Sequence, residues 1–213
     1  MEKLTNVDID KYLKSGELSQ PFIDSKLLKE KVDIDYYNRL KLKGNANQLE
    51  SLYFWIHKNL ESADDEFRKK YKFNRNAGEI WESGKATGCT DYALVFATLA
   101  RQLGIPTTLL HTSEKTFLFK LINNESFSMR SGHSFCECFY DGKWILVDPT
   151  KKEIVGEYNP DIIELPYSLG GEGLNKYIPY YRGLDLGKKM TLREHGDFEE
   201  DCIAKINFDS MIK

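Results

Sequence analysis

The sequence has few cysteines, no long hydrophobic run and no excess of either charge, and each shortage excludes a class of protein. Its 213 residues include four cysteines, at positions 89, 136, 138 and 202, too few for a disulfide-stapled scaffold. Lys plus Arg number 30 and Asp plus Glu number 33. The basic excess typical of a general nucleic-acid binder is therefore missing, and we expect no nucleic-acid partner.

Hydrophobic runs are short throughout the chain. The longest covers residues 92–99 and is interrupted by Thr98, whereas a membrane span needs about 18 apolar residues. The first ten residues contain neither the apolar segment nor the small-residue cleavage site of a signal peptide. These features predict a cytoplasmic protein with reduced thiols and no membrane partner.

The chain nevertheless has enough apolar residues to build a core. It is 41% hydrophobic and 13% aromatic, which excludes disorder along the whole chain. Its length suits one domain with extensions or two small domains. The residue pattern predicts a charged, helical N-terminal extension over 1–45, a core over 46–155, and a C-terminal extension over 156–213 that packs on or near the core.

Two segments of this core have clear helical patterns. Apolar residues recur every three or four positions and predict a helix over about 47–60. Residues 89–103 are apolar nearly all round, which is typical of a buried helix, and Gly104 is a stop signal at its end. We expect Thr87 or Thr90 to cap the start of this second helix.

Other segments of the core favour strands. Residues 134–140 and 143–147 flank Asp141-Gly142, a favoured two-residue hairpin turn. β-rich composition predicts further extended segments, at 107–110, 116–121 and 127–129.

Cys89 occupies a position suited to a nucleophile. It follows Gly88 and begins the buried helix, where the helix dipole and unpaired N–H groups stabilise a thiolate and lower its pKa. Gly88 leaves room for another molecule to approach the sulfur. Alternation along the strand places Cys136 and Cys138 on the face opposite to His133, so we interpret them as small core residues.

The hairpin register brings a histidine and an aspartate onto one face. With the turn at Asp141-Gly142, Phe135 lies opposite Asp148, and His133 becomes a diagonal neighbour of Asp148 at about 7–8 Å. Their side chains can then form a hydrogen bond of the kind that orients a histidine for general-base work. Glu137 shares this face, either as a supporting residue of the site or as a partly exposed strand residue.

Three segments together resemble the transglutaminase-like superfamily over residues 48–150. They are GCTDYA at 88–93 continuing to LARQLGIP at 99–106, GHSFCE at 132–137, and GKWILVDPT at 142–150. Their order and spacing match the cysteine, histidine and aspartate segments of that family. Two details depart from its pattern: Phe135 stands where Trp is common, and Gly88 precedes Cys89 with no intervening residue.

The resemblance implies an α+β fold with a papain-like core, in which a cysteine-bearing buried helix packs on an antiparallel β-sheet. It also implies that residues 46–155 are the catalytic core, with a triad of Cys89, His133 and Asp148. The Cys89 backbone N–H is a candidate oxyanion donor, and Trp81 or Asn76 could add a side-chain donor.

We therefore predict a cysteine protease or amidase that hydrolyses a peptide, protein or glycopeptide amide through a thioester. Hydrolysis is favoured because water needs no acceptor site. One alternative is a cross-linking transglutaminase, and another is a catalytically silent peptide- or protein-binding module on the same fold. An arylamine acyltransferase also uses Cys, His and Asp, but has a different run around its cysteine. No metal and no other cofactor is expected, because no second Cys or His pair has ligand spacing.

Overall fold

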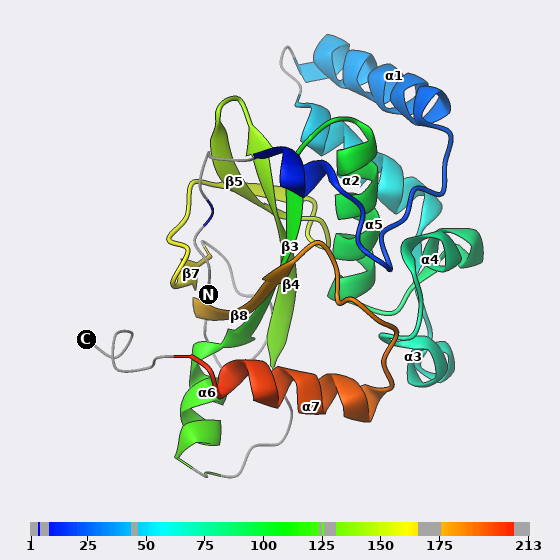
Figure 1. Ribbon diagram of the computed structural model, residues 1–213. Helices are drawn as coiled ribbons and strands as arrows, with labels where there is room; N and C mark the ends of the chain where they lie inside the picture. The colour runs from blue at the N-terminus through cyan, green and yellow to red at the C-terminus, as the bar shows by residue number, and fades with distance from the viewer. Residues whose placement is uncertain are drawn as a thin grey trace.

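The computed structural model describes residues 4, 9–43, 47–123, 125, 131–165 and 176–206. These residues form a six-stranded sheet with helices packed around it (Figure 1). The expected α+β architecture, a buried helix against an antiparallel sheet, is confirmed. Within the described ranges no helix is long and apolar enough to cross a membrane.

The elements have the following bounds. The helices are η1 (Ile9–Leu13), α1 (Ser25–Lys43), α2 (Gln48–Asn59), α3 (Asp65–Tyr71), α4 (Ala77–Ser83), α5 (Cys89–Gln102), α6 (Lys115–Ile122) and α7 (Leu192–Ile203). The strands are β1 (Glu61–Ser62), β2 (Lys85–Ala86), β3 (Thr107–Glu114), β4 (Gly132–Tyr140), β5 (Lys143–Asp148), β6 (Glu153–Gly156), β7 (Ile163–Glu164) and β8 (Lys176–Gly183).

The main sheet has the strand order β6-β5-β4-β3-β8-β7, and each neighbouring pair is antiparallel. The β4–β5 register runs from Tyr140 opposite Lys143 to Cys136 opposite Val147, which confirms the predicted hairpin. Asp141 and Gly142 have φ values of 51° and 81°, the positive angles that the two central residues of a type I′ turn require.

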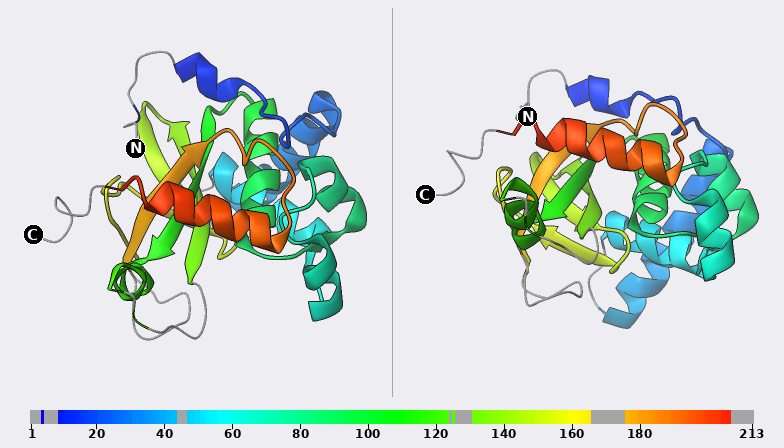
Figure 2. Two further views of the ribbon diagram at one scale, coloured as in Figure 1. Left: turned by 60° about the horizontal axis from the view of Figure 1, so that its bottom comes forward. Right: turned by 90° about the horizontal axis from the view of Figure 1, so that it is seen from below.

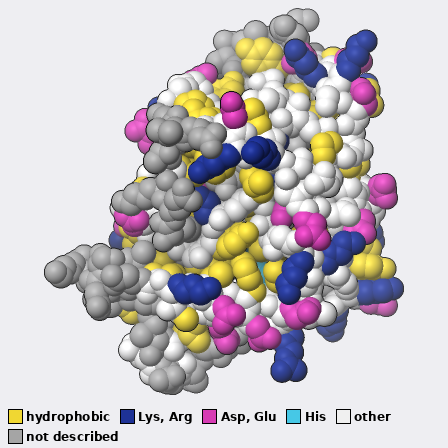
Figure 3. Space-filling model, viewed as in Figure 1, with side chains coloured by type: hydrophobic (Ala, Val, Ile, Leu, Met, Phe, Trp, Pro, Cys, Tyr) yellow, Lys and Arg dark blue, Asp and Glu magenta, His cyan; other side chains and the backbone are white. Residues whose placement is uncertain are grey.

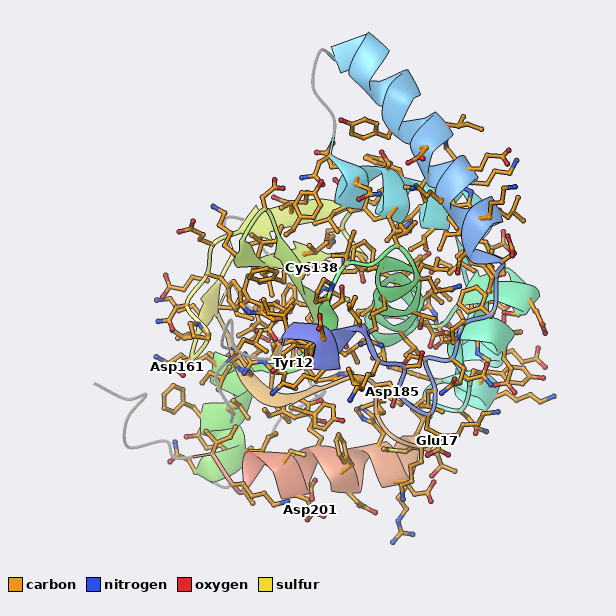
Figure 4. The ribbon with its side chains drawn as sticks, turned by 45° about the horizontal axis from the view of Figure 1, so that its top comes forward. Tyr12, Glu17, Cys138, Asp161, Asp185 and Asp201 are labelled. Atoms are coloured by element: carbon orange, nitrogen blue, oxygen red, sulfur yellow. The ribbon has the colours of Figure 1, made fainter. Side chains whose placement is uncertain are left out.

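Helix α5 is the centre of the core. Its residues are buried from Thr90 to Arg101, because apolar side chains surround it and it packs against β4, β3, α2 and α4. The thiol of Cys136 donates to the carbonyl of Ala93 at 3.3 Å. Cys136 and Cys138 are both fully buried, as expected of core residues, and Figure 4 shows Cys138 between the sheet and α5.

The predicted cap of α5 is wrong. The N-cap is Gly88, which has no side chain to bond with. The Thr87 hydroxyl and backbone N–H instead donate to Asp91 at 2.8 and 2.7 Å, and Arg75 donates to the same carboxylate at 2.5 Å. The start of the helix is therefore held by Asp91 in its first turn. Because the N-cap is a glycine, no side chain fills the space beside it.

One predicted strand is also wrong. Residues 116–121 lie in α6, and Phe117 and Leu118 pack with Ile178 and Tyr180 of β8. A short apolar run fits a strand and a buried helix equally well by pattern, and the contact with β8 decides between them here. The helix predicted at 47–60 is α2, residues 107–110 belong to β3, and 127–129 lie outside the described residues.

The segment between η1 and α1 contacts the segment that follows β8. The Asp185 carboxylate accepts from the backbone N–H groups of Leu18 and Ser19 at 2.7 and 2.9 Å, and Figure 4 shows Asp185 near the segment that carries Glu17. Arg101 of α5 donates to Ser19 Oγ at 3.0 Å and to the Leu184 carbonyl at 2.7 Å.

The C-terminal part of the chain supplies a strand and a helix close to the sheet. Strand β8 is hydrogen-bonded between β3 and β7, and α7 runs across one end of the sheet (Figure 2). The division of the chain at residues 45 and 155 stays a prediction.

Candidate active site

The three residues that the sequence analysis selected lie together. Cys89 is the first residue of α5, His133 lies near the start of β4, and Asp148 is the last residue of β5. His133 Nε2 is 2.9 Å from Asp148 Oδ2, and the ring lies close enough to Cys89 to lower the pKa of that thiol. Helix packing against β4 thus places the sulfur, and the hairpin register places the aspartate.

The aspartate is held by the loop that follows β5. Asp148 is fully buried, and its Oδ1 accepts from the backbone N–H groups of Thr150 and Lys151 at 3.0 and 3.1 Å. His57 of α2 donates from Nε2 to the Pro149 carbonyl at 2.7 Å. These contacts fix the carboxylate so that Oδ2 is directed at His133.

Cys89 and His133 change each other's acidity. Burial raises the pKa of Cys89, but the charge of His133 and hydrogen bonds with His133 and Ser134 lower it to about 7. Burial lowers the pKa of His133, but the charge of Cys89 and hydrogen bonds with Asp148 and Cys89 raise it to about 10. Because the imidazolium is the weaker acid of this coupled pair, the pair holds a thiolate and an imidazolium near neutral pH.

A pocket of about 380 Å³ opens beside the sulfur. Apart from its two chain neighbours, a Cβ added at Gly88 would meet no atom of the described residues within 4 Å, so the approach to Cys89 from this side is clear. In the view of Figure 3, hydrophobic side chains and a histidine lie just above α7, between charged side chains of both signs. The pocket is lined by Lys72, Phe73, Thr87, Gly88, Cys89, Thr90, His111, Thr112, Gly132, His133, Ser134, Tyr180, Leu192, Arg193, His195, Gly196, Asp197 and Glu199.

The two candidate oxyanion side chains lie elsewhere. Asn76 caps α4 and accepts from the Glu79 N–H at 2.9 Å, while Trp81 packs against Phe22 and Trp55. Neither is among the described residues that line the pocket. Asn76 begins a helix and therefore bonds to that helix, and Trp81 lies on the face of α4 that contacts α2.

Glu137 is fully buried, so its interpretation as a partly exposed strand residue is wrong. It accepts from Arg182 of β8 at 2.6 Å through both carboxylate oxygens and from the Tyr158 hydroxyl. This ion pair bridges β4 and β8 across β3. Glu137 is not among the described residues that line the pocket beside Cys89.

Several residues of the site were missed from the sequence. Ser134 lies beside the sulfur, and His111 pairs with it across β3 and β4. The same alternation that puts Cys136 on the face covered by α5 would also have put Ser134 on that face, opposite to His133. The segment between β3 and β4 gives no turn signal that would set their register, so His111 could not be paired with Ser134 beforehand. Across the residues that the structure describes, no group of three or more His, Cys, Asp or Glu side chains is arranged to hold a metal ion.

Three solved structures show some similarity to this chain. A candidate cysteine protease from Cytophaga hutchinsonii superposes with a TM-score of 0.50 and 17% identity, over 88% of this chain and 50% of the other. The chain thus spans about half the length of that protein. Calcium-bound LapG of Legionella pneumophila gives a TM-score of 0.39 and 18% identity, over 82% of this chain and 99% of LapG. A TGase structure gives a TM-score of 0.38 and 14% identity, over 59% of this chain and 31% of the other.

No curated protein matches the chain significantly. A family model does match: that of the transglutaminase-like superfamily, over residues 35–149, which is more than half of the 213 residues. The chain therefore belongs to the transglutaminase-like superfamily.

Proposed function

We propose that the protein is a cysteine protease or amidase that hydrolyses amide bonds through a thioester on Cys89. The observation that supports this most directly is the arrangement of Cys89, His133 and Asp148 beside an open pocket. A sulfur at a helix N-terminus, paired with a histidine that an aspartate orients, is the arrangement expected of an activated thiol nucleophile.

Acylation begins from the thiolate–imidazolium pair. The Cys89 sulfur attacks the carbonyl carbon of a bound amide, and the carbonyl oxygen becomes negatively charged. His133 then gives its proton to the nitrogen of the departing amine, the C–N bond breaks, and a thioester remains on Cys89. Asp148 keeps the ring oriented and stabilises its positive charge.

Deacylation uses the now neutral His133 as a base. It takes a proton from water while the water oxygen attacks the thioester carbon, and the C–S bond then breaks. The carboxylic acid leaves, and Cys89 is a thiolate paired with the imidazolium again. We assign one oxyanion donor to the backbone N–H of Cys89, because the first N–H groups of a helix have no intrahelical partner.

The substrate is a peptide, protein or glycopeptide amide in this proposal. The pocket beside Cys89 is large enough for a side chain on the acyl side of the bond. Because a thiolate nucleophile works only while it is reduced, we also propose that the protein acts in a reducing compartment such as the cytoplasm.

The test is a comparison of new peptide termini. The wild type, Cys89→Ala and Cys202→Ala are incubated with a peptide library made from a proteome, and cleavage products are identified by mass spectrometry. We expect cleavage by the wild type and by Cys202→Ala, whose half-buried thiol lies on α7 away from the pocket lining, and none by Cys89→Ala.

A biotinylated alkylamine added in parallel reports amine transfer. If the amine is incorporated into proteins and no cleavage occurs, the reaction is cross-linking and not hydrolysis. If neither cleavage nor amine transfer occurs with any substrate, the protein is a binding module and the proposal fails.

A further inference from the structure

Cys89 has a second polar neighbour that the proposed mechanism does not use. Its sulfur lies 3.8 Å from the Ser134 hydroxyl oxygen. That oxygen is 3.0 Å from His111 Nδ1 and 3.1 Å from Thr90 Oγ1. A chain of hydrogen bonds therefore runs from the sulfur to β3, separate from the link through His133 to Asp148.

The tautomer of His111 follows from its surroundings. The side chain is buried, and burial, followed by the nearby charges of His195 and His133, lowers its pKa to about 3. The ring is therefore neutral and carries a single N–H. Its Nε2 is buried and has no hydrogen-bond partner among the described residues.

An unpaired buried N–H is rarer in proteins than an under-satisfied acceptor. The hydrogen of His111 therefore belongs on Nδ1, where it is donated to the Ser134 oxygen. The Thr90 hydroxyl, also within hydrogen-bond distance, can fill the second lone pair of that oxygen. The Ser134 hydrogen then has one remaining neighbour, the sulfur of Cys89.

We propose that Ser134 and His111 are positioning residues that stabilise the thiolate of Cys89 through this relay. The inference rests on the proposed role of Cys89 as the nucleophile, and it deepens that role. In the relay, His111 donates to Ser134 and Ser134 donates to the sulfur. The backbone of Ser134 also helps to lower the pKa of Cys89, so Ser134 acts on the sulfur through both its main chain and its side chain.

Other charged or titratable groups face the same space and stay unchanged in the test. His133 and Asp148 come from β4 and β5, and Tyr177 of β8 is close enough to Cys89 to interact with its charge. The remaining groups line the pocket from α7 and from the end of α3: Arg193, His195, Asp197, Glu199 and Lys72.

The experiment measures the rate of Cys89 alkylation by iodoacetamide against pH, with the labelled peptide quantified by mass spectrometry. The variants are Ser134→Ala, which ends the relay at the sulfur, and His111→Leu, which removes the donor to Ser134. His111→Asn is the matched control, because its amide nitrogen can occupy the place of Nδ1 and still donate an N–H.

Ser134→Ala and His111→Leu are each expected to raise the midpoint of the alkylation profile by about 0.5 to 1 pH unit, and His111→Asn to leave it within about 0.3. The midpoint, unlike the plateau rate, reports thiolate formation and does not follow from altered packing alone. Folding of each variant is checked by near-ultraviolet circular dichroism and thermal melting.

Unchanged midpoints in folded Ser134→Ala and His111→Leu would overturn the relay. If His111→Leu and His111→Asn shift the midpoint equally, His111 is not part of the relay. Should Ser134→Ala not fold, the His111 pair decides alone. Alkylation needs no substrate, so a wild type that cleaves nothing contradicts the proposed function and leaves this measurement intact.

Discussion

Replacing His133 by Gln should slow the reaction of Cys89 with an electrophile at neutral pH. The wild-type pKa of Cys89 is about 7 because burial, which raises it, is outweighed by the charge of His133 together with hydrogen bonds from His133 and Ser134. Glutamine is uncharged at every pH. The variant thiol therefore keeps the burial that raises its pKa and loses the main interaction that lowers it.

The size of the effect follows from the two pKa values. At pH 7 about half of the wild-type sulfur is thiolate, whereas a thiol with the ordinary pKa of 9.0 is about 1% thiolate, a loss of about 50-fold. A more basic thiolate is intrinsically more reactive, and with a Brønsted slope of about 0.4–0.5 two units return about 8-fold. The net expectation is a rate at least about 6-fold lower.

The assay is iodoacetamide labelling from pH 5 to 10, with each cysteine followed by its own peptide. The other cysteines are internal controls, because burial raises the pKa of Cys136, of Cys202 and, to about 12, of Cys138. In the folded wild type, Cys89 should label fastest of the four near pH 7. A midpoint that stays near 7 in His133→Gln, or that lies near 9 in the wild type, would refute the ion pair.

Three further outcomes are expected. Asp148→Asn should lower kcat/KM for a cleaved peptide by at least about 10²-fold, because His133 loses its charged partner. In the wild type, kcat/KM should rise as Cys89 ionises near pH 7 and fall as His133 loses its proton near pH 10, since amide cleavage needs the thiolate and the imidazolium together. Asp91→Asn should lower the free energy of unfolding in urea by about 3–5 kcal/mol, because it leaves the buried Arg75 without its carboxylate partner; a loss below about 1 kcal/mol would contradict this.

The residues of one hairpin show what local pattern determines. The two-residue turn at Asp141-Gly142 sets the β4–β5 register, and a two-residue side-chain period then places His133 and Asp148 on the same face. These relations span 15 residues and depend only on backbone geometry. The start of α5 at Cys89 is likewise local, because a buried apolar run follows it directly.

Other features depend on contacts between distant segments. The apolar run at 116–121 became α6 because it packs on β8, which lies more than 50 residues later in the chain. The Glu137–Arg182 pair and the tie between Asp185 and Ser19 also join segments far apart in sequence.

The sequence by itself determined the helix that begins at Cys89, the hairpin that pairs His133 with Asp148, and the burial of Cys136 and Cys138. Only the tertiary structure decided that His111 meets Ser134, that α7 forms a wall of the pocket, and that Asn76 and Trp81 lie outside it. The physical reason is that turn geometry and side-chain periodicity act over a few residues. The relative placement of β3, β8 and α7 is set by packing around α5 and across the sheet, which no local pattern encodes.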